Sequence, residues 1–477
     1  MLFRLFYDPK LAQASYLVGC SITGEALVVD PNRDIKQYLD AAHAEGLLVA
    51  HVTETHIHAD FASGSRELAR EAGAQLYLSG EGGPDWQYAF AESDDAVVLH
   101  DGDTFDVGNI QVKTMHTPGH TPEHLSFMVT DRAATERPMG IFTGDFLFVG
   151  DVGRPDLLER AARIEGTMVA SARQMFQSLQ NLESLPDYLQ IWPGHGAGSA
   201  CGKALGAVPQ STLGYERMVN WALSITNEQE FVDSVLAGQP SPPKYFAEMK
   251  RMNREGPRIL GDQVAPGQSN IDTLLRRAAA GDIVVDTRPA TEFAAGHVPG
   301  TISIPMNKSF TKWAGWLIPY DRDFHLIVAD ETKLAEARRD LSMIGLDRLG
   351  HWAPAEALDE WTGGGGTLQS VRQMTPADLA AESDGAVVLD VRERHEWKAG
   401  HLPGVPNIPL GELQDRIDEV PQGRPLVLHC QGGGRSSIAA SVLQAQGVEN
   451  VINLVGGFRA WQEQGHPVEH AEEEVEA

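Results

Sequence analysis

The sequence has few cysteines, few positive charges and no long apolar run. Its three cysteines, Cys20, Cys201 and Cys430, lie far apart among 477 residues and form no CxxC pair. This pattern excludes a disulfide framework and favours a reducing compartment. Lys and Arg number 38 against 66 Asp and Glu, which gives a net charge of −28. We therefore expect neither nucleic acid nor a membrane surface as a partner, since both require a basic face.

No apolar stretch approaches the roughly 18 residues of a membrane span. The first residues, MLFRLFYDPK, reach Asp8 before an apolar core of signal-peptide length develops. A cytoplasmic protein is therefore the expectation. The composition, 42% hydrophobic and 22% charged, is that of a globular chain, and the length indicates about two to four domains.

An internal repeat determines the organisation of the second half. Residues 286–305, DTRPATEFAAGHVPGTISIP, and residues 390–409, DVRERHEWKAGHLPGVPNIP, are identical at ten of twenty positions. Their offset of 104 residues is too long for a solenoid repeat and indicates two copies of a whole domain. Short apolar runs alternate with helix-like stretches in each copy, which predicts an α/β sheet with parallel strands.

The repeat and the composition divide the chain into four segments. The first mixes apolar strands with helices, ends in a helical extension and does not join the repeat. The last is a solvated acidic tail. The predicted segments are residues 1–255, the two copies at 265–365 and 370–468, and the tail at 469–477.

Several histidines and aspartates of the first segment stand at the ends of apolar, strand-like runs. The motifs are THIHADF, TPGHT, FTGDF and WPGHG, in that order along the chain. Loops at strand ends place functional groups, and a series of His and Asp framed by Gly, Pro and Thr predicts a metal site. The residues concerned are His56, His58, Asp60, Phe61, His120, Asp145 and His195.

Together these motifs resemble the metallo-β-lactamase superfamily over roughly residues 1–200. The resemblance implies an αββα sandwich, and an HxHxDH signature with a later His, a bridging Asp and a final His that hold one or two metals. Phe61 stands where the signature ends in His, and a phenyl ring cannot ligate. A binuclear hydrolase site is therefore disfavoured.

The persulfide dioxygenase branch of that superfamily assigns a single Fe(II) per chain to three of these residues, His56, His120 and Asp145. Two histidines and one carboxylate form the facial triad of non-haem iron oxygenases. His58 would ligate in a glyoxalase-type zinc site but lie just outside the iron shell of a dioxygenase. Asp60 and His195 are interpreted as residues that orient ligands or water.

Two further features concern the substrate. Arg154, in GRPD, resembles a segment that shapes the substrate side in dioxygenases; the alternative is an ordinary loop ion pair. Glutathione-specific relatives carry an aromatic residue just beyond the final His, and here His195 is followed by GAGSACGKALG. Coenzyme A or another small thiol is therefore considered beside glutathione. Cys201, close by in sequence, is interpreted as a small buried residue.

In the last segment Cys430 directly follows a strand-like run and precedes a helix-like one. Glycines let successive N–H groups point inward, and the helix N-terminus adds partial positive charge. A thiol placed there should ionise readily and carry an anionic sulfur group. Arg435 adds a fixed cation to the catalytic pair. The remaining residues of the predicted cradle are Gln431, Gly432, Gly433, Gly434 and Ser436.

This loop, with DVRERHEW and GHLPG, resembles the rhodanese family, whose pattern is CxxGxR[ST], over about residues 370–465. Phosphatases use Cx5R, whereas four residues separate Cys430 from Arg435, which favours sulfur over phosphate. Aligning LIVAD with LVLHC puts Asp330 opposite Cys430 in the first copy. No glycine-rich loop follows and 265–365 holds no cysteine, so this copy is predicted to be an inactive spacer.

The whole order resembles persulfide dioxygenase–rhodanese fusions that serve sulfide detoxification. It implies oxidation of a small thiol persulfide by O₂ to sulfite at one iron, coupled to rhodanese sulfur transfer that can form thiosulfate. The alternative is a zinc-dependent, glyoxalase II-like thioester hydrolase fused to a sulfurtransferase; a third is a non-enzymatic sulfur sensor. The thiol, the direction of sulfur flow and the oligomeric state stay open, and a homo-oligomer is compatible with the sequence.

Overall fold

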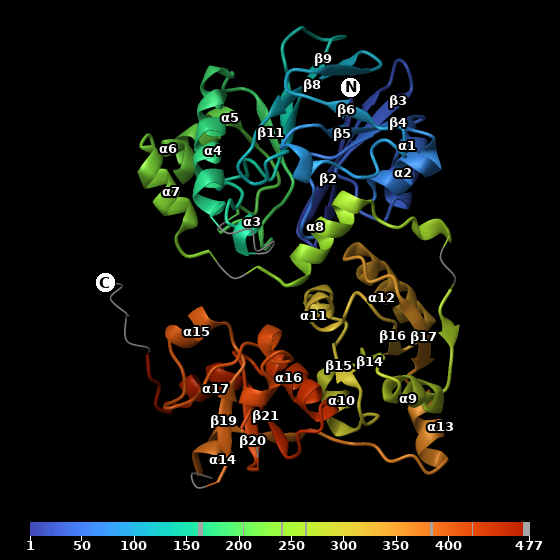
Figure 1. Cartoon of the computed structure of the whole chain (residues 1–477), viewed down its shortest axis with the longest axis vertical. Coiled ribbons are helices and arrows are strands. Elements are labelled where there is room, and N and C mark those ends of the chain that lie inside the picture. The colour runs from blue at the N-terminus through green and yellow to red at the C-terminus, as the bar shows by residue number, and fades with distance from the viewer. Residues whose placement is uncertain are drawn as a thin grey trace. The chain divides into compact units, whose positions relative to one another are not determined.

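The computed structural model describes residues 1–160, 166–203, 205–239, 242–262, 265–381, 385–421 and 423–470. It comprises two compact units, shown in Figure 1. The first is Met1–Val264 with Ser342–Gly345, and the second is Ala265–Leu341 with Leu346–Ala477. Within the described ranges, no helix combines the length and the apolar character that crossing a membrane would require.

The first unit contains two six-stranded sheets. One has the order β1 (Leu2–Asp8), β2 (Gln13–Cys20), β3 (Glu25–Val29), β4 (Leu48–Thr53), β5 (Gln75–Ser79), β6 (Val97–Leu99). The other has the order β12 (Ser211–Thr212), β11 (Gln190–Pro193), β10 (Gly140–Gly144), β9 (Leu125–Asp131), β8 (Ile110–His116), β7 (Thr104–Val107). Inward side chains of both sheets, among them Tyr16, Phe127 and Trp192, form one buried core between them.

Helices cover the outer face of each sheet. α1 (Lys36–Ala44) and α2 (Ser65–Ala72) pack on the first sheet. α4 (Met168–Gln180), α5 (Leu213–Val219), α6 (Trp221–Ser224) and α7 (Glu228–Leu236) pack on the second. The predicted αββα sandwich is therefore confirmed. The unit also contains α3 (Leu157–Arg160), α8 (Tyr245–Glu255) and the 3-10 helices η1 (Pro84–Trp86), η2 (Asn181–Ser184) and η3 (Leu260–Asp262).

The second unit holds two parallel sheets, as the repeat predicted. The sheet of the middle copy has the order β13 (Gly267–Gln268), β17 (Leu349–Pro354), β16 (Phe324–Val328), β14 (Ile283–Asp286), β15 (Ile302–Ser303). The sheet of the last copy has the order β18 (Arg372–Met374), β21 (Val451–Leu454), β20 (Leu426–His429), β19 (Val387–Asp390).

Helices connect these strands in both copies. The middle copy contains α9 (Ile271–Ala279), α10 (Ala290–Ala295), α11 (Phe310–Leu317), α12 (Glu331–Met343) and α13 (Ala357–Gly363). The last copy contains α14 (Pro376–Ala381), α15 (Arg394–Lys398), η4 (Leu410–Glu412), η5 (Ile417–Glu419), α16 (Gly434–Ala445) and α17 (Gly457–Glu463). Of the predicted acidic tail, only Glu469 and His470 are described, and Glu469 pairs with His401 in an isolated antiparallel bridge.

The two copies differ at the turn from strand to helix. β20 ends at His429 and α16 begins at Gly434, which leaves four residues between them. β16 ends at Val328 and α12 begins at Glu331, which leaves only two. The middle copy therefore lacks the space for a cradle as well as the thiol.

The sheet register corrects one predicted equivalence. Asp286 pairs with Ile327, and its counterpart Asp390 pairs with His429. The strand position of Cys430 is therefore occupied by Val328, so the alignment of Asp330 with Cys430 is wrong by two residues. Asp330 instead caps α12, because its Oδ1 accepts a hydrogen bond from the Lys333 amide at 2.9 Å.

Candidate metal centre and cysteine loop

Three of the predicted metal donors meet at one edge of the sandwich. His56 follows β4, His120 lies in the loop between β8 and β9, and Asp145 directly follows β10. All three are buried, and one ligand atom of each lies within 4.8 Å of the others. The His120 Nε2 is 3.5 Å and the His56 Nε2 is 3.9 Å from the Asp145 Oδ2.

The free atoms of this group fit one metal cation. The His56 Nε2 and the Asp145 Oδ2 are buried and have no hydrogen-bond partner among the described residues. Buried polar atoms without a partner are energetically costly, and a metal ion bound to both atoms would explain them. The opposite ring nitrogens are already held: His56 Nδ1 lies 3.0 Å from the Thr55 hydroxyl and His120 Nδ1 lies 3.1 Å from the Arg154 carbonyl. Such contacts fix ring orientation around a metal. Burial lowers the pKa of both histidines, which favours the neutral, ligating imidazole.

His58 does not join this group of donors. Its Nε2 lies 3.0 Å from the Asp30 carboxylate, and its Nδ1 has no partner in the described part of the chain. Burial acts to lower the pKa of His58, but Asp30 outweighs it and raises that pKa to about 9. The residue therefore lies beside the three donors, in contact with His56 at a ring-centroid distance of 4.2 Å.

The position of a second metal is organised differently. Asp60, His195 and Cys201 form another group of buried donor atoms. The two ring nitrogens of His195 are each 2.7 Å from a carboxylate oxygen, one of Asp145 and one of Asp60. Burial lowers the pKa of His195, but the two carboxylates outweigh it and raise that pKa well above its ordinary value. Phe61 is fully buried beside His58, with ring centroids 4.4 Å apart, and supplies only carbon.

Arg154 is engaged in a buried ion pair. Its Nε and Nη2 bind the two carboxylate oxygens of Asp156 at 3.0 and 2.8 Å, and both side chains have no exposed surface. Its Nη1 donates to the Ala200 carbonyl at 3.2 Å. Arg154 therefore forms the ordinary loop ion pair that the sequence analysis gave as the alternative role. Its contact with substrate stays a prediction. The Arg154 carbonyl also orients His120, a role that the sequence motif did not reveal.

Sequence reasoning missed three residues that support this site. Asp30 accepts hydrogen bonds from the Thr55 amide and hydroxyl at 2.7 and 2.9 Å. Its signal was present, since it ends the apolar run ALVVD. Asn253 of α8 donates to the His58 and Phe61 carbonyls at 2.7 Å each and so holds the motif loop. Tyr245, also from α8, is buried, and burial together with the charge of Asp60 raises its pKa.

In the second unit, Cys430 stands at the bottom of a tight loop. Its Sγ accepts hydrogen bonds from the Gly433 amide at 3.1 Å and from the Ser436 hydroxyl at 3.6 Å. Gly433 has a φ of 95°, which favours glycine. Gln431, Gly432 and Gly434 complete the loop, and the Gln431 Oε1 accepts from the Arg392 Nη1 at 3.3 Å.

Two residues outside the loop, Glu396 and Gly457, contact it. Glu396 of α15 pairs with Arg435, whose Nη2 lies 2.7 Å from the Glu396 Oε1. Gly457 packs so closely that a Cβ there would lie 2.2 Å from the Cys430 carbonyl oxygen. Neither Glu396 nor Gly457 was singled out in the sequence. Their arrangement leaves a buried sulfur beside N–H and O–H donors, which suits an anionic sulfur group.

Comparison with known proteins identifies the same two kinds of domain. The model of the metallo-beta-lactamase superfamily matches residues 8–195, and that of the rhodanese-like domain matches residues 270–353 and 375–464. A solved metallo-beta-lactamase from Staphylococcus aureus subsp. aureus COL is 45% identical with a TM-score of 0.68, and the match covers 74% of this chain and 99% of that one. The chain belongs to the metallo-β-lactamase superfamily. It carries, in addition, two rhodanese-like domains.

Two curated relatives cover parts of the chain. The putative sulfur carrier protein YrkF of Bacillus subtilis (strain 168) is 33% identical over 140 residues, 28% of this chain and 76% of that protein. A beta-lactamase hydrolase-like protein of Xylella fastidiosa (strain 9a5c) is 27% identical over 260 residues, 48% of this chain. The match spans 53% of that Xylella protein, about half its length.

Proposed function

We propose that the first unit oxidises a small thiol persulfide with O₂ at one iron, and that Cys430 carries sulfane sulfur. The overall reaction is R–SSH + O₂ + H₂O → R–SH + SO₃²⁻ + 2 H⁺. The observation that carries the proposal is the contrast between the two metal positions. One offers His56, His120 and Asp145 with unpartnered atoms, while at the other both nitrogens of His195 lie against carboxylates.

An iron ion held by two histidines and one carboxylate would supply open positions for O₂ and for the persulfide sulfur. The residues of the chain set the geometry. Asp145 uses Oδ1 to bind His195 and keeps Oδ2 for the metal. Phe61 and Phe148 place carbon against the second position, with the Phe148 ring centroid 6.2 Å from that of His195. A hydrolase with two metals would need a further ligand there.

The cysteine loop supplies the transfer chemistry. A terminal sulfur on Cys430 would be held as an anion by the Gly433 amide and the Ser436 hydroxyl. When sulfite attacks that sulfur, an S–S bond to sulfite forms and the bond to the Cys430 sulfur breaks. Cys430 leaves as a thiolate and the product is thiosulfate, so that no further oxidant or reductant is needed.

Metal analysis with oxygen uptake tests the first half of this proposal. Protein purified without added metal is expected to contain about one iron per chain, because at the second position both ring nitrogens of His195 already lie against carboxylates. It should consume O₂ when offered a thiol persulfide. Two zinc ions per chain, with thioester hydrolysis and no oxygen uptake, would show instead that the glyoxalase II-like alternative is correct.

The product ratio tests the coupling of the two activities. Sulfite from the first unit is a good acceptor for sulfane sulfur, and fusion raises the effective concentration of one activity near the other to about the millimolar range. With a thiol persulfide and O₂, the wild type is expected to release a substantial fraction of thiosulfate. The Cys430→Ser variant should release mainly sulfite. An enzyme-free control with the same sulfite level corrects for the spontaneous reaction, and equal ratios in the two proteins would refute the coupling.

A further inference from the structure

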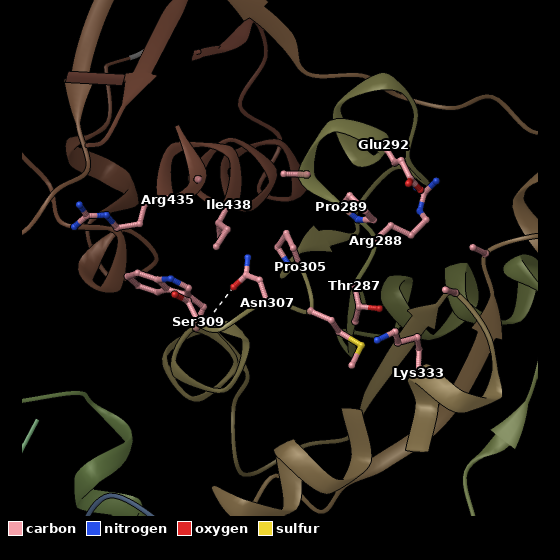
Figure 2. A pocket seen from close by; sticks show the side chains of 16 residues that line it. Thr287, Arg288, Pro289, Glu292, Pro305, Asn307, Ser309, Lys333, Arg435 and Ile438 are labelled. Carbon is pink, nitrogen blue, oxygen red and sulfur yellow. Dashed lines mark hydrogen bonds between the residues drawn. The ribbon is translucent and has the colours of Figure 1, made fainter. Parts of the chain in front are cut away.

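The second unit contains a pocket of about 680 Å³ between its two rhodanese-like copies. Figure 2 shows its lining: Thr287 and Arg288 follow β14, while Ile438 of α16 reaches in from the last copy. The copies touch directly beside it, since the Ser303 amide donates to the Ser441 hydroxyl at 2.8 Å. The pocket therefore lies at the carboxyl ends of the middle strands, where a parallel α/β sheet binds its ligands.

The short turn of the middle copy explains why this space exists. In the last copy, the four-residue loop of Cys430 fills the carboxyl edge of the sheet and Arg392 donates through Nη1 to Gln431. Arg288 repeats the other contacts of Arg392: its Nη2 binds Asp286 at 2.7 Å and the Gly296 carbonyl at 2.9 Å. Within the described part of the chain, the Arg288 Nη1 has no acceptor. Arg288 is also one of the residues that line the pocket.

The chemistry of the lining is amphipathic. Three cationic residues, Arg288, Lys333 and Arg435, line the pocket beside one carboxylate, Glu292, although the chain as a whole carries a net charge of −28. Figure 2 shows the Arg435 guanidinium pointing away from the pocket, so Arg288 and Lys333 are the cations that remain for a ligand. Each of the three cations already pairs with a carboxylate outside the pocket lining: Asp286, Glu336 and Glu396, respectively. Their charge is therefore partly neutralised, and what remains suits a ligand with one anionic group rather than several. The rest of the wall is largely apolar and includes Pro289, Pro305, Met306, Trp313 and Ile438.

The size of the pocket selects among sulfur compounds. Pockets for organic ligands measure about 300–1,000 Å³, and this one falls in that range. Thiosulfate, with five heavy atoms, would leave most of it empty and would not use the apolar wall. Gly434 and Arg435, which directly continue the Cys430 loop, form part of the lining. A ligand here therefore lies beside the loop that is proposed to carry the sulfur.

We propose that this pocket binds the organic part of a small thiol that bears a carboxylate or phosphate, and presents its sulfur to Cys430. The inference rests on the proposed sulfur-carrier role of Cys430. The thiolate R–S⁻ attacks the terminal sulfur of Cys430–S–SH; the new R–S–SH bond forms, the Cys430 S–S bond breaks, and Cys430 leaves as a thiolate. The degenerate copy thereby supplies the thiol-binding side of the active one.

A pocket-filling substitution tests this assignment. Ala329 is exposed, follows β16 and lines the pocket, so that Ala329→Trp should fill the space without disturbing the core. Ala279→Trp, on the exposed face of α9 and outside this pocket, is the matched control. Thiosulfate is the sulfur donor and coenzyme A or glutathione the acceptor. The KM for the acceptor is expected to rise about tenfold or more in Ala329→Trp only.

A second readout does not depend on turnover. Desulfo-coenzyme A lacks the thiol that would consume iodoacetamide, and it should slow the alkylation of Cys430 by that reagent in the wild type and in Ala279→Trp. The alkylation is followed by mass spectrometry of the Cys430 peptide. Desulfo-coenzyme A should give no protection in Ala329→Trp. If both variants show the same KM and the same protection, the pocket assignment is wrong. If the wild type transfers no sulfur from thiosulfate to cyanide, the proposed carrier function fails, while the alkylation experiment still decides the pocket.

Discussion

Asp145→Asn protein is expected to bind iron at least about 100-fold more weakly than the wild type and to lose oxygen uptake. Loss of a residue that only contacts a metal ligand commonly lowers metal affinity by about 10–100-fold, and Asp145 is proposed to be a ligand itself. The Asp145 carboxylate has two separate roles. Its Oδ1 binds His195 at 2.7 Å, and its Oδ2 faces the Nε2 atoms of His56 and His120. Asparagine keeps the size and one carbonyl oxygen, but it removes the negative charge that the cation requires.

The experiment has an internal control for folding. Iron content and oxygen uptake report on the first unit, while transfer of sulfur from thiosulfate to cyanide reports on the second. The variant should keep the transfer activity. Asp106→Asn, the same substitution at an exposed aspartate of β7, should keep iron and oxygen uptake. Wild-type iron content and oxygen uptake in Asp145→Asn would remove Asp145 from the metal site.

Local motifs of the sequence predicted the donors of this site, but not what supports them. His56, His120 and Asp145 each stand in a short motif at a strand end, so that the alternation of strands and loops brings them to one edge. Asn253 comes from α8, 195 residues after the His58 carbonyl that it binds. A single asparagine in a helix has no local pattern that shows its partner, and only the folded packing reveals it.

The repeat predicted two related sheets, yet the alignment of their apolar runs misplaced the turn. LIVA and LVLH are both continuous apolar runs, and such runs contain no feature that fixes which residues face each other across the sheet. The hydrogen-bonded register fixes this and shows that Val328, not Asp330, occupies the place of Cys430. The missing two residues also explain the pocket, which sequence reasoning did not predict.

The structure also bears on the roles of His58 and His195, which the sequence left open. His58 binds Asp30 through Nε2, while its Nδ1 is buried without a hydrogen-bond partner among the described residues. His195 lies between two carboxylates, a relation between residues 60, 145 and 195 that no motif spacing encodes. These contacts support one complete metal position and agree with the loss of the signature His at Phe61.

The Cys430→Ser protein is expected to lose the transfer of sulfur from thiosulfate to cyanide by at least about 1,000-fold, because loss of a catalytic nucleophile is among the costliest changes in an enzyme. A serine hydroxyl cannot carry sulfane sulfur, although it can accept the same hydrogen bonds from Gly433 and Ser436. The middle copy offers no substitute: Val328 occupies the position of Cys430, and Asp330 caps α12.

The remaining two cysteines provide the control. Burial acts to raise the pKa of Cys20, but hydrogen bonds from Asn109 and Thr23 outweigh it and lower that pKa to about 7. Because its thiol ionises readily, Cys20 is the cysteine that could compete with Cys430 as a nucleophile. Burial raises the pKa of Cys201 well above its ordinary value. Cys20→Ser is therefore expected to keep the transfer activity, measured as thiocyanate formed, that Cys430→Ser loses. Near wild-type transfer in Cys430→Ser would assign the carrier sulfur to another residue and overturn the role of the loop.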